Sequence, residues 1–438
     1  MTGVRARDQL IELYSAAVAG ANVEALTADA VATIRLERRH RVWVFSFGKA
    51  AHVMANAAVE TLHRALAEVA GGIVVAQQEG EAPAGTVSVF VGDHPIPGRR
   101  SFTAAARIGQ IVAQKRASDL GIVLLSGGAS SLIAAPLRGM SESDLSQLYE
   151  LLLGAGLDIH QMNAIRKRFS YWAAGRMALT LAPARTYCFA ASDVTGDDLA
   201  TIGSGPVVPD PTRVQEVIDL LKSVQLLGKI SSSFRQFLVD TTRGAVPETP
   251  KAAHPAFAHV SAKVVANNTA ALRAAATAAQ RQGLNPIVRD QPLVGDAAAA
   301  GARVVEALLV VRARAERGST QCCIWGGETT VALRGPAAPG GRCQELALSA
   351  SKHLADAGEQ GEGITLLAAG TDGRDGTTNA AGAVVDATTW RTISAGRDAA
   401  AALRNHESHD ALSAADALFS PGLTGTNVMD VTIGLVRA

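Results

Sequence analysis

Short apolar runs alternate with longer segments of helical periodicity along the first half of the chain. The runs that are typical of buried strands are 41–47, 72–76, 87–91, 121–125 and 187–191. The segments with helical spacing of apolar residues are about 2–19, 22–35, 50–70, 142–155 and 158–180. This alternation predicts a parallel α/β sheet with flanking helices.

The second half repeats the same rhythm after a change in composition. Three prolines, Pro247, Pro250 and Pro255, interrupt a polar segment that lacks periodicity, so we predict a linker at about 243–255. The strands expected beyond it are 262–266, 286–289, 322–325, 364–368 and 431–436, with helices at about 268–283, 296–315 and 343–357. We therefore predict two α/β domains, 1–245 and 256–438, and leave open whether the C-terminal segment packs back on the N-terminal domain.

Length and charge narrow the class of protein. A chain of 438 residues is too long for one ordinary core, which supports two domains. The balance of 41 basic and 40 acidic residues, with no basic tract, argues against a nucleic-acid partner. Four cysteines without C-x-x-C spacing indicate free thiols in a reducing compartment. No signal-peptide pattern starts the chain and no apolar run reaches 18 residues, so we expect a cytoplasmic protein without a membrane span.

Polar, glycine-containing segments follow several predicted strands of the first half. The run Ser126-Gly127-Gly128-Ala129-Ser130-Ser131 offers backbone N–H groups and hydroxyls that suit an oxyanion, although an ordinary strand-to-helix turn has the same composition. Lys49 follows the first strand in a chain that has only eight lysines. Asp193 opens an acidic cluster after the fifth strand, where a solvated Asx turn is the alternative. We interpret His94, in a proline-rich turn, as structural.

A second glycine-rich stretch lies in the second half. Gly326-Gly327-Glu328-Thr329 follows a short β run and, after a Pro/Gly turn, Gly340-Gly341-Arg342 opens a helix. Flexible glycines and the exposed N–H groups of a helical turn attract anions, which would place Arg342 beside a phosphate or carboxylate seat. A β-hairpin with an exposed arginine is the alternative.

Several familiar catalytic motifs are missing. The sequence has no G-x-x-x-x-G-K-[ST], G-x-G-x-x-G, G-x-S-x-G, H-E-x-x-H or kinase-type H-R-D motif. The Asp372-Gly-Arg-Asp-Gly376 loop has the wrong spacing for an EF-hand. The candidate groups that remain are a lysine, an arginine, aspartates and turns whose backbone N–H groups can bind an anion. Phosphoryl transfer requires such groups, because that chemistry consists mostly of positioning and charge neutralisation.

The order of these motifs resembles one known family over nearly the whole chain. The matching stretches are Gly48-Lys-Ala50, Asp93-His-Pro-Ile-Pro97, Ser126 to Ser131, Ser192 to Asp198, Gly203-Ser-Gly-Pro206, Gly326 to Thr330, Gly340 to Glu345, Ala369 to Gly376 and Thr424-Gly-Thr-Asn427. This succession is similar to the glycerate 2-kinase family with a C-terminal MOFRL domain. The resemblance implies a Rossmann-like N-terminal domain, a smaller α/β second domain and an active site in the cleft between them.

The resemblance also implies an activity and its residues. The activity is ATP-dependent phosphorylation of the 2-hydroxyl of D-glycerate, with Mg²⁺ or another divalent cation. Lys49, Asp193 and Arg342 match the residues that matter for activity in the family. The stretch Ser126 to Ser131, called the serine loop below, is expected to bind either nucleotide phosphate or the glycerate carboxylate. Gly327, Glu328 and Thr329 are expected to contribute to substrate or phosphate binding from the second domain. The metal candidates are Asp197 and Asp372, with Asp193 as base or metal ligand.

Two departures and two rival functions accompany this interpretation. Cys343 stands where the family usually has asparagine, and Ala129 where it usually has glycine. The first rival is an NAD(P)H-dependent hydroxypyruvate reductase, a name also attached to similar chains, for which we find no phosphate fingerprint. The second is a non-catalytic sugar-acid-binding protein. The expected partners are D-glycerate and a nucleotide, and a homodimer is one assembly that the sequence leaves open.

Overall fold

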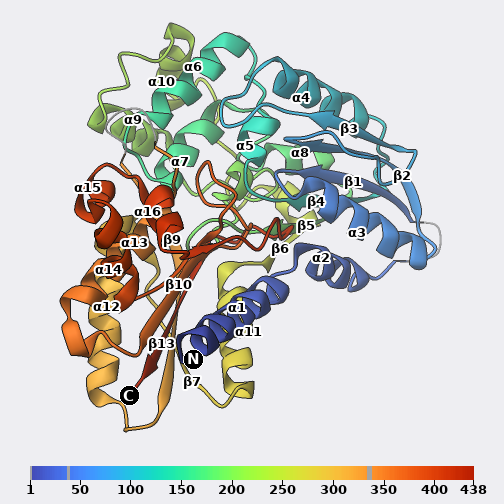
Figure 1. Ribbon diagram of the computed structural model, residues 1–438. Helices are drawn as coiled ribbons and strands as arrows, with labels where there is room; N and C mark the ends of the chain where they lie inside the picture. Colours follow the sequence, from blue (N-terminus) through green and yellow to red (C-terminus); the bar gives the residue numbers. More distant parts are fainter. Residues whose placement is uncertain (1, 37–39, 333–337) are drawn as a thin grey trace. The chain divides into compact units, whose positions relative to one another are not determined.

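The computed structural model describes residues 2–36, 40–332 and 338–438, and its chain divides into two compact units. We call Val23–Ala266 the N-terminal unit. The residues up to Asn22 join Asn267–Ala438 in the C-terminal unit. Both units contain a β-sheet with helices packed on it (Figure 1). The mixed α/β class predicted from the sequence is therefore confirmed.

The N-terminal unit is built on a six-stranded parallel sheet. Its strands are β1 Arg41–Phe47, β2 Glu68–Ala76, β3 Val87–Val91, β4 Leu120–Leu125, β5 Arg185–Ala191 and β6 Val260–Ala266. They lie in the order β3-β2-β1-β4-β5-β6, which is the order of dinucleotide-binding doubly wound sheets. Continuous apolar runs form the central strands because both faces of this sheet are covered.

Helices cover both faces of this sheet. They are α2 Val23–Ala32, α3 Ala51–Arg64, α4 Arg99–Val112, α5 Ala129–Leu132, α6 Glu142–Leu153, α7 Ile159–Phe169, α8 Arg176–Leu181, α9 Val214–Ser223 and α10 Ser232–Thr242, with 3-10 turns at Ile202–Ser204 and Pro255–His259. The helices α4, α5 and α8 share one core cluster with β1, whereas α3 packs on the opposite face (Figure 1). A separate apolar cluster joins α6, α7, α9 and α10.

Two expected helices differ in extent from the prediction. The segment predicted as one helix over 158–180 forms α7 and α8, because Ser170 after α7 is extended and α8 starts only after Gly175, which has a φ of 77°. Asp158 and Gln161 form a capping box that starts α7. The helix predicted over 50–70 ends at Arg64, and β2 begins at Glu68.

The C-terminal unit contains a mixed sheet rather than a parallel one. Its strands are β7 Asn285–Val288, β8 Leu293–Asp296, β9 Thr320–Thr330, β10 Ile364–Gly370, β11 Gly382–Asp386, β12 Leu418–Phe419 and β13 Asp430–Arg437. The order is β12-β11-β10-β13-β9-β7, with β8 beside β9. The strand β13 lies antiparallel between β10 and β9, so the C-terminal segment forms the middle of its own unit's sheet.

The helices of the C-terminal unit also form two layers. They are α1 Thr2–Gly20, α11 Asn268–Arg281, α12 Ala297–Arg314, α13 Arg342–Asp356, α14 Ala387–Gly396, α15 Ala399–Arg404 and α16 Ser408–Ala414, with a 3-10 turn at Gly358–Gln360. The helix α1 lies beside α11 (Figure 1) and contacts β10 and β13. The Tyr14 hydroxyl donates to the Gly370 carbonyl at 2.8 Å, which ties the first helix to the last third of the chain.

The boundary between the units lies at residue 266/267 instead of at the proline-rich segment 243–255. Strand β6 pairs with β5, so the chain completes the first sheet before it leaves the N-terminal unit. The proline-rich segment is tied into that unit, since the Thr249 hydroxyl donates to Asp210 Oδ2 at 2.7 Å. Composition indicated a linker there, but polar side chains of this segment form hydrogen bonds with buried residues of the N-terminal unit.

Strand β9 does not stop at the glycine pair, contrary to our expectation. It continues to Thr330, and Gly327 pairs with Leu293 of β8. A Cβ atom at Gly326 would lie 1.6 Å from Asn268 Oδ1, and one at Gly327 2.3 Å from the Leu293 carbonyl oxygen. These glycines therefore permit close packing within a continuous strand. The predicted Pro/Gly turn that follows falls largely on 333–337, outside the described residues.

Candidate active site

Two turns meet at the carboxyl ends of β1 and β4. These neighbouring strands flank the point where the strand order reverses, and ligands of open α/β sheets bind in the crevice outside such a point. The turn after β1 contains Gly48 and Lys49, and the turn after β4 contains Ser126, Gly127 and Gly128. Topology alone therefore places the predicted lysine and the predicted serine loop at one edge of the sheet.

Hydrogen bonds hold the two turns against each other. The Lys49 backbone N–H donates to the Gly127 carbonyl at 2.9 Å, and the Ala50 N–H donates to Ser126 Oγ at 3.0 Å. Gly48 has a φ of 123°, and a Cβ atom there would lie 2.3 Å from Ser126 Oγ. Only glycine permits this approach. The contact fixes the backbone from which the Lys49 side chain extends.

Asp193 and His94 complete this edge of the N-terminal unit. A Cβ atom at Gly127 would lie 1.8 Å from Asp193 Oδ2, so the carboxylate rests directly on the loop. A Cβ atom at Gly128 would lie 3.1 Å from His94 Cδ2 and 3.7 Å from Lys49 Cγ. The structure thus brings Lys49, the serine loop and Asp193 together, as the sequence predicted. It also adds His94, which we had interpreted as structural.

The serine hydroxyls shape the loop more than they line it. The Ser126 hydroxyl accepts the Ala50 N–H and also contacts the Phe47 carbonyl oxygen, at 3.4 Å. The Ser131 hydroxyl donates to the Gly128 carbonyl at 3.1 Å, and both serines are buried. The expectation that these two hydroxyls serve as donors to a ligand is not matched by this geometry.

Ser130 and Ala129 connect the loop to the turn around Gly203. The hydroxyls of Ser130 and Ser204 are 2.6 Å apart. Ala129 is buried, and a Cβ atom at Gly203, which has a φ of 57°, would lie 3.1 Å from the Ala129 Cβ. The methyl group that departs from the family pattern is therefore accommodated by a glycine on the facing turn. The following helix α5 has only four residues.

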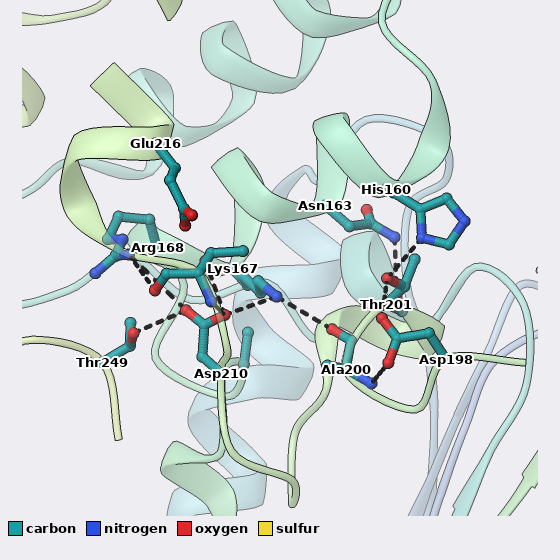
Figure 2. Close-up of polar contacts among 12 residues, drawn as sticks. His160, Asn163, Lys167, Arg168, Asp198, Ala200, Thr201, Asp210, Glu216 and Thr249 are labelled. Carbon is teal, nitrogen blue, oxygen red and sulfur yellow. Dashed lines mark hydrogen bonds and ion pairs between the residues drawn. The ribbon is translucent and has the colours of Figure 1, made fainter. Parts of the chain in front are cut away.

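Helix α7 supplies basic side chains that the sequence reading left without a role. Arg166, Lys167 and Arg168 are consecutive and all buried. Figure 2 shows Lys167 and Arg168 converging on Asp210. The Lys167 Nζ lies 2.8 Å from Asp210 Oδ1. Burial alone would raise the pKa of Asp210, but the charge and hydrogen bond of Lys167 and the hydrogen bonds from Thr249 and Thr212 lower it overall. A run of three cations in a helix preceded by a capping box is the only sequence signal for this cluster.

Arg166 differs from its two neighbours in what it contacts. Its guanidinium lies 4.5 Å from the centre of the Tyr149 ring, and its Nη1 lies 3.4 Å from Asn163 Oδ1. The Tyr149 hydroxyl donates to the Ser130 carbonyl at 3.1 Å, which links Arg166 to the serine loop. Partial burial, then Lys49 and Arg166, lower the pKa of His94 to about 4, so its imidazole is neutral at pH 7.

The mouth of α13 in the C-terminal unit already contains carboxylates. Arg342 donates from Nε and Nη2 to the two Asp430 oxygens at 2.6 and 2.9 Å, and its Nη1 lies 2.9 Å from Glu328 Oε1. The Gln344 backbone N–H donates to Asp375 Oδ2 at 2.8 Å. The anion seat predicted beside Arg342 is therefore filled by the protein's own Asp375. Arg342 is also not simply exposed, since its side chain retains 32% of its accessible surface.

Burial controls the protonation of this helix mouth. Burial and the nearby Asp430 together raise the pKa of Asp375 to about 6, although the Gln344 N–H acts to lower it. Cys343 is also buried, which raises the pKa of its thiol well above the usual value, and its side chain hydrogen-bonds to Asp430. Cys343 therefore takes part in the Arg342 cluster through its thiol, where the family has an amide.

The remaining predicted residues are distributed over both units. In the C-terminal unit, Thr329 is buried, and Asp372 accepts the Arg374 N–H at 3.0 Å. In the N-terminal unit, Asp197 occupies a turn with a φ of 55°. Within the described ranges no three His, Cys, Asp or Glu side chains gather as metal ligands. Mg²⁺ in kinases commonly uses one or two carboxylates plus substrate phosphates, so this donor set fits a metal that accompanies the nucleotide. No described helix is long and apolar enough to cross a membrane.

Comparison with known proteins agrees with this architecture. Residues 9–239 match the family described as "Domain of unknown function (DUF4147)", and residues 321–430 match the MOFRL family. Glycerate 2-kinase of Pyrococcus horikoshii is 34% identical over 92% of this chain and 89% of its own length. A protein of Agrobacterium vitis with the provisional name hydroxypyruvate reductase is 35% identical over 99% of this chain and 95% of its own.

Relatives in Thermotoga maritima support the same assignment. D-glycerate 2-kinase of that organism is 35% identical over 90% of this chain and 91% of its own length. The crystal structure of a glycerate kinase from T. maritima superposes with a TM-score of 0.85 at 32% identity, and the match covers 99% of both chains. The chain belongs to the glycerate 2-kinase family.

Proposed function

We propose that this protein is an ATP-dependent glycerate 2-kinase, which transfers the γ-phosphoryl group of ATP to the 2-hydroxyl of D-glycerate. One observation carries the proposal: Lys49, the Ser126–Ser131 loop and Asp193 meet at the strand-order reversal of a doubly wound sheet. These groups supply the positioning and charge neutralisation that phosphoryl transfer needs. The family of the chain supports the same reaction.

The side chains of this edge have distinct tasks in the proposed reaction. Asp193 accepts the proton of the 2-hydroxyl as the O2–phosphorus bond forms and the bond between phosphorus and the β,γ-bridging oxygen breaks. Lys49 neutralises charge on the phosphoryl oxygens. The absence of a Cβ atom at Gly127 lets the Asp193 carboxylate lie directly against the loop that is proposed to bind the substrate oxyanion. ADP leaves with the bridging oxygen.

The proposal also assigns roles to a bound Mg²⁺ and to Arg342. Mg²⁺ bound with the nucleotide would supply charge neutralisation of the phosphates, and Asp193 or Asp197 are the residues of this edge that would contact it. Asp372 is the corresponding candidate in the C-terminal unit. Arg342 is assigned to stabilisation of the transferred group. Its bidentate pairing with Asp430 and its contact with Glu328 fix the orientation of the guanidinium.

The proposal is tested by product identity. The protein is incubated with D-glycerate and MgATP, and separately with hydroxypyruvate and NADH or NADPH, and the product is assigned by phosphorus–proton correlation NMR. We expect ADP and 2-phosphoglycerate, with no oxidation of the reduced cofactor. Formation of 3-phosphoglycerate would contradict transfer to the 2-hydroxyl, and oxidation of the cofactor would support the reductase. If neither reaction occurred, the non-catalytic binding protein would be the supported alternative.

Two variants test the assigned residues. In Asp193→Asn and Lys49→Met we expect kcat to fall by about 100-fold or more, because general-base and electrostatic contributions are each of this order. Gly154→Ala is the matched control in the same unit, since a Cβ atom there meets nothing within 4 Å. Turnover within a few-fold of wild type in both variants would remove these roles.

A further inference from the structure

The three consecutive cations of α7 have unequal partners. Lys167 and Arg168 both reach Asp210, whose side chain is fully buried, and Arg168 also pairs with Glu248. Arg168 Nη2 further donates to the Thr212 carbonyl at 3.0 Å. These two residues therefore neutralise the buried Asp210 and the partly exposed Glu248, which join α7 to the loops at 210–212 and 248–249. Their role is structural.

Arg166 makes no such pair. Only 7% of its surface is accessible, yet among the described residues no carboxylate lies within ion-pairing distance of it. Within the described part of the chain its Nε has no hydrogen-bond partner, and the bond from Nη1 to Asn163 is long at 3.4 Å. A buried charge without a counter-ion is unfavourable, and burial lowers the pKa of Arg166 accordingly. The fold thus keeps an uncompensated cation at this position.

The neighbours of Arg166 connect it to the serine loop. Tyr149 lies beneath the guanidinium and donates to the Ser130 carbonyl oxygen. The charges of Arg166 and Lys49 both act on His94, whose imidazole lies against Gly128. Two cations from different elements therefore converge on one loop. The side chains of His94, Tyr149 and Asn163 around Arg166 are neutral at pH 7.

We propose that Arg166 binds an oxyanion of a substrate at the serine loop, and that this anion is the counter-ion which the described residues do not supply. The planar guanidinium, supported by the Tyr149 ring, has an Nε–H without a partner among the described residues, and its fork geometry matches a carboxylate or a phosphate. The inference rests on the proposed function for the identity of the anion, which is either the carboxylate of D-glycerate or a phosphate of ATP. Its existence depends only on the geometry.

The proposal assigns this residue a different task from the hydroxyls of the loop. Because the hydroxyls of Ser126 and Ser131 are hydrogen-bonded to the backbone, the loop itself presents mainly N–H groups to a ligand. Arg166 adds the full charge that an oxyanion site in a partly buried position requires. The neutral state of His94 at pH 7 leaves it as a hydrogen-bonding rather than a charged neighbour.

The test compares Arg166→Met and Arg166→Lys with wild type. Binding of inorganic sulfate is followed by thermal shift, and Kd values for D-glycerate and for ADP are measured by calorimetry. We expect Arg166→Met to lose the sulfate-induced shift, to weaken one of the two ligands at least tenfold, and to keep or raise the Tm without ligand. Arg166→Lys should recover part of the sulfate effect. Arg243→Met, an exposed arginine of the same unit, is the neutral control.

The outcomes separate the sources of the anion and the two proposals. Weakening of D-glycerate alone identifies the carboxylate, and weakening of ADP alone identifies a phosphate. A sulfate effect lost in Arg166→Met, in a protein that fails to phosphorylate glycerate, would retain the anion site and remove the proposed function. Unchanged binding of all three anions would overturn the inference. So would a fall in Tm like that of Arg168→Met, which leaves Asp210 and Glu248 short of a partner.

Discussion

The serine loop and the mouth of α13 share a sequence signature but differ in their electrostatics. Both present a glycine pair at the start of a helix, with basic residues nearby. At α13 the protein supplies its own anions: Asp375 accepts from the helix N-terminus, and Asp430 and Glu328 hold Arg342. Near the serine loop the buried Arg166 has no such counter-ion within the described part of the chain.

This difference shows that a basic motif in the sequence does not reveal whether the protein's own carboxylates pair with it. A guanidinium with two carboxylates is oriented and largely neutralised, whereas one over a tyrosine ring keeps its charge for a ligand. The two arginines should therefore respond oppositely to removal. Loss of Arg342 should affect stability as well as turnover, and loss of Arg166 should affect ligand binding.

The largest expected effect follows from Arg342→Met. This change leaves Asp430 and Asp375 buried beside each other without a cation, and we expect roughly 3 kcal/mol of destabilisation, at the low end for broken buried pairs because Glu328 is partly exposed. Urea denaturation measures this change. We also expect kcat to fall far more than ATP affinity.

A second substitution provides the control for Arg342→Met. Adding Asp430→Asn removes the orphaned charge, so the double variant should regain part of the lost stability but none of the turnover. If Arg342→Met were as stable as wild type, the contrast between the two arginines would disappear.

An intermediate effect is expected from Gly127→Ala. The new Cβ atom would lie 1.8 Å from Asp193 Oδ2, so the carboxylate must move. Displacement of a reacting group by about 1 Å can cost about 100-fold in rate, and we expect a loss of this size in kcat/KM with little change in Tm. Steady-state kinetics beside Gly154→Ala as control decides the matter. Full activity would show that Asp193 does not act from its position against the loop.

The smallest expected effect is a change in pH dependence at the α13 mouth. Burial and Asp430 raise the pKa of Asp375 from 3.8 to about 6, so the folded protein holds this proton more tightly than the unfolded chain. The contribution of Asp375 to stability is therefore greatest below about pH 4 and is lost as pH rises through 6. In Asp375→Asn this contribution should vanish.

The difference between wild type and Asp375→Asn isolates that contribution. The unfolding free energies of the two proteins should diverge by about 1 kcal/mol per pH unit between pH 4 and 6. Other groups titrate in the same range, including His94, whose lowered pKa acts in the opposite direction. These terms cancel in the difference. Parallel curves would show that Asp375 carries no shifted proton.

Much of the fold follows from local patterns in the sequence. The strands β1, β3, β4 and β5 and the helices α1, α11, α12 and α13 lie within a few residues of their expected positions, because continuous apolar runs and helical spacing are strong signals. The boundary at 266/267 was not predictable in this way, since it depends on the pairing of β6 with β5. The membership of α1 in the C-terminal unit depends likewise on packing with α11.

The candidate site shows the same division between local and distant information. Lys49, Gly127 and Asp193 could be named because each follows a strand, and the carboxyl ends of parallel strands share one edge of a sheet. Arg166 could not be distinguished from Lys167 and Arg168, since the three are adjacent in one helix. Their difference depends on Asp210 and Glu248, which lie 40 to 80 residues away.

The glycine-rich stretch from Gly326 to Glu345 marks the limit of sequence information. By itself the sequence determined two α/β units, a family, and the residue types that phosphoryl transfer requires. Only the tertiary structure decided that β9 runs through its glycines, that Asp375 fills the α13 mouth, and that Arg166 has no counter-ion among the residues described. Composition and periodicity are local properties of the chain. Charge compensation depends on which distant side chains the fold brings within a few ångströms.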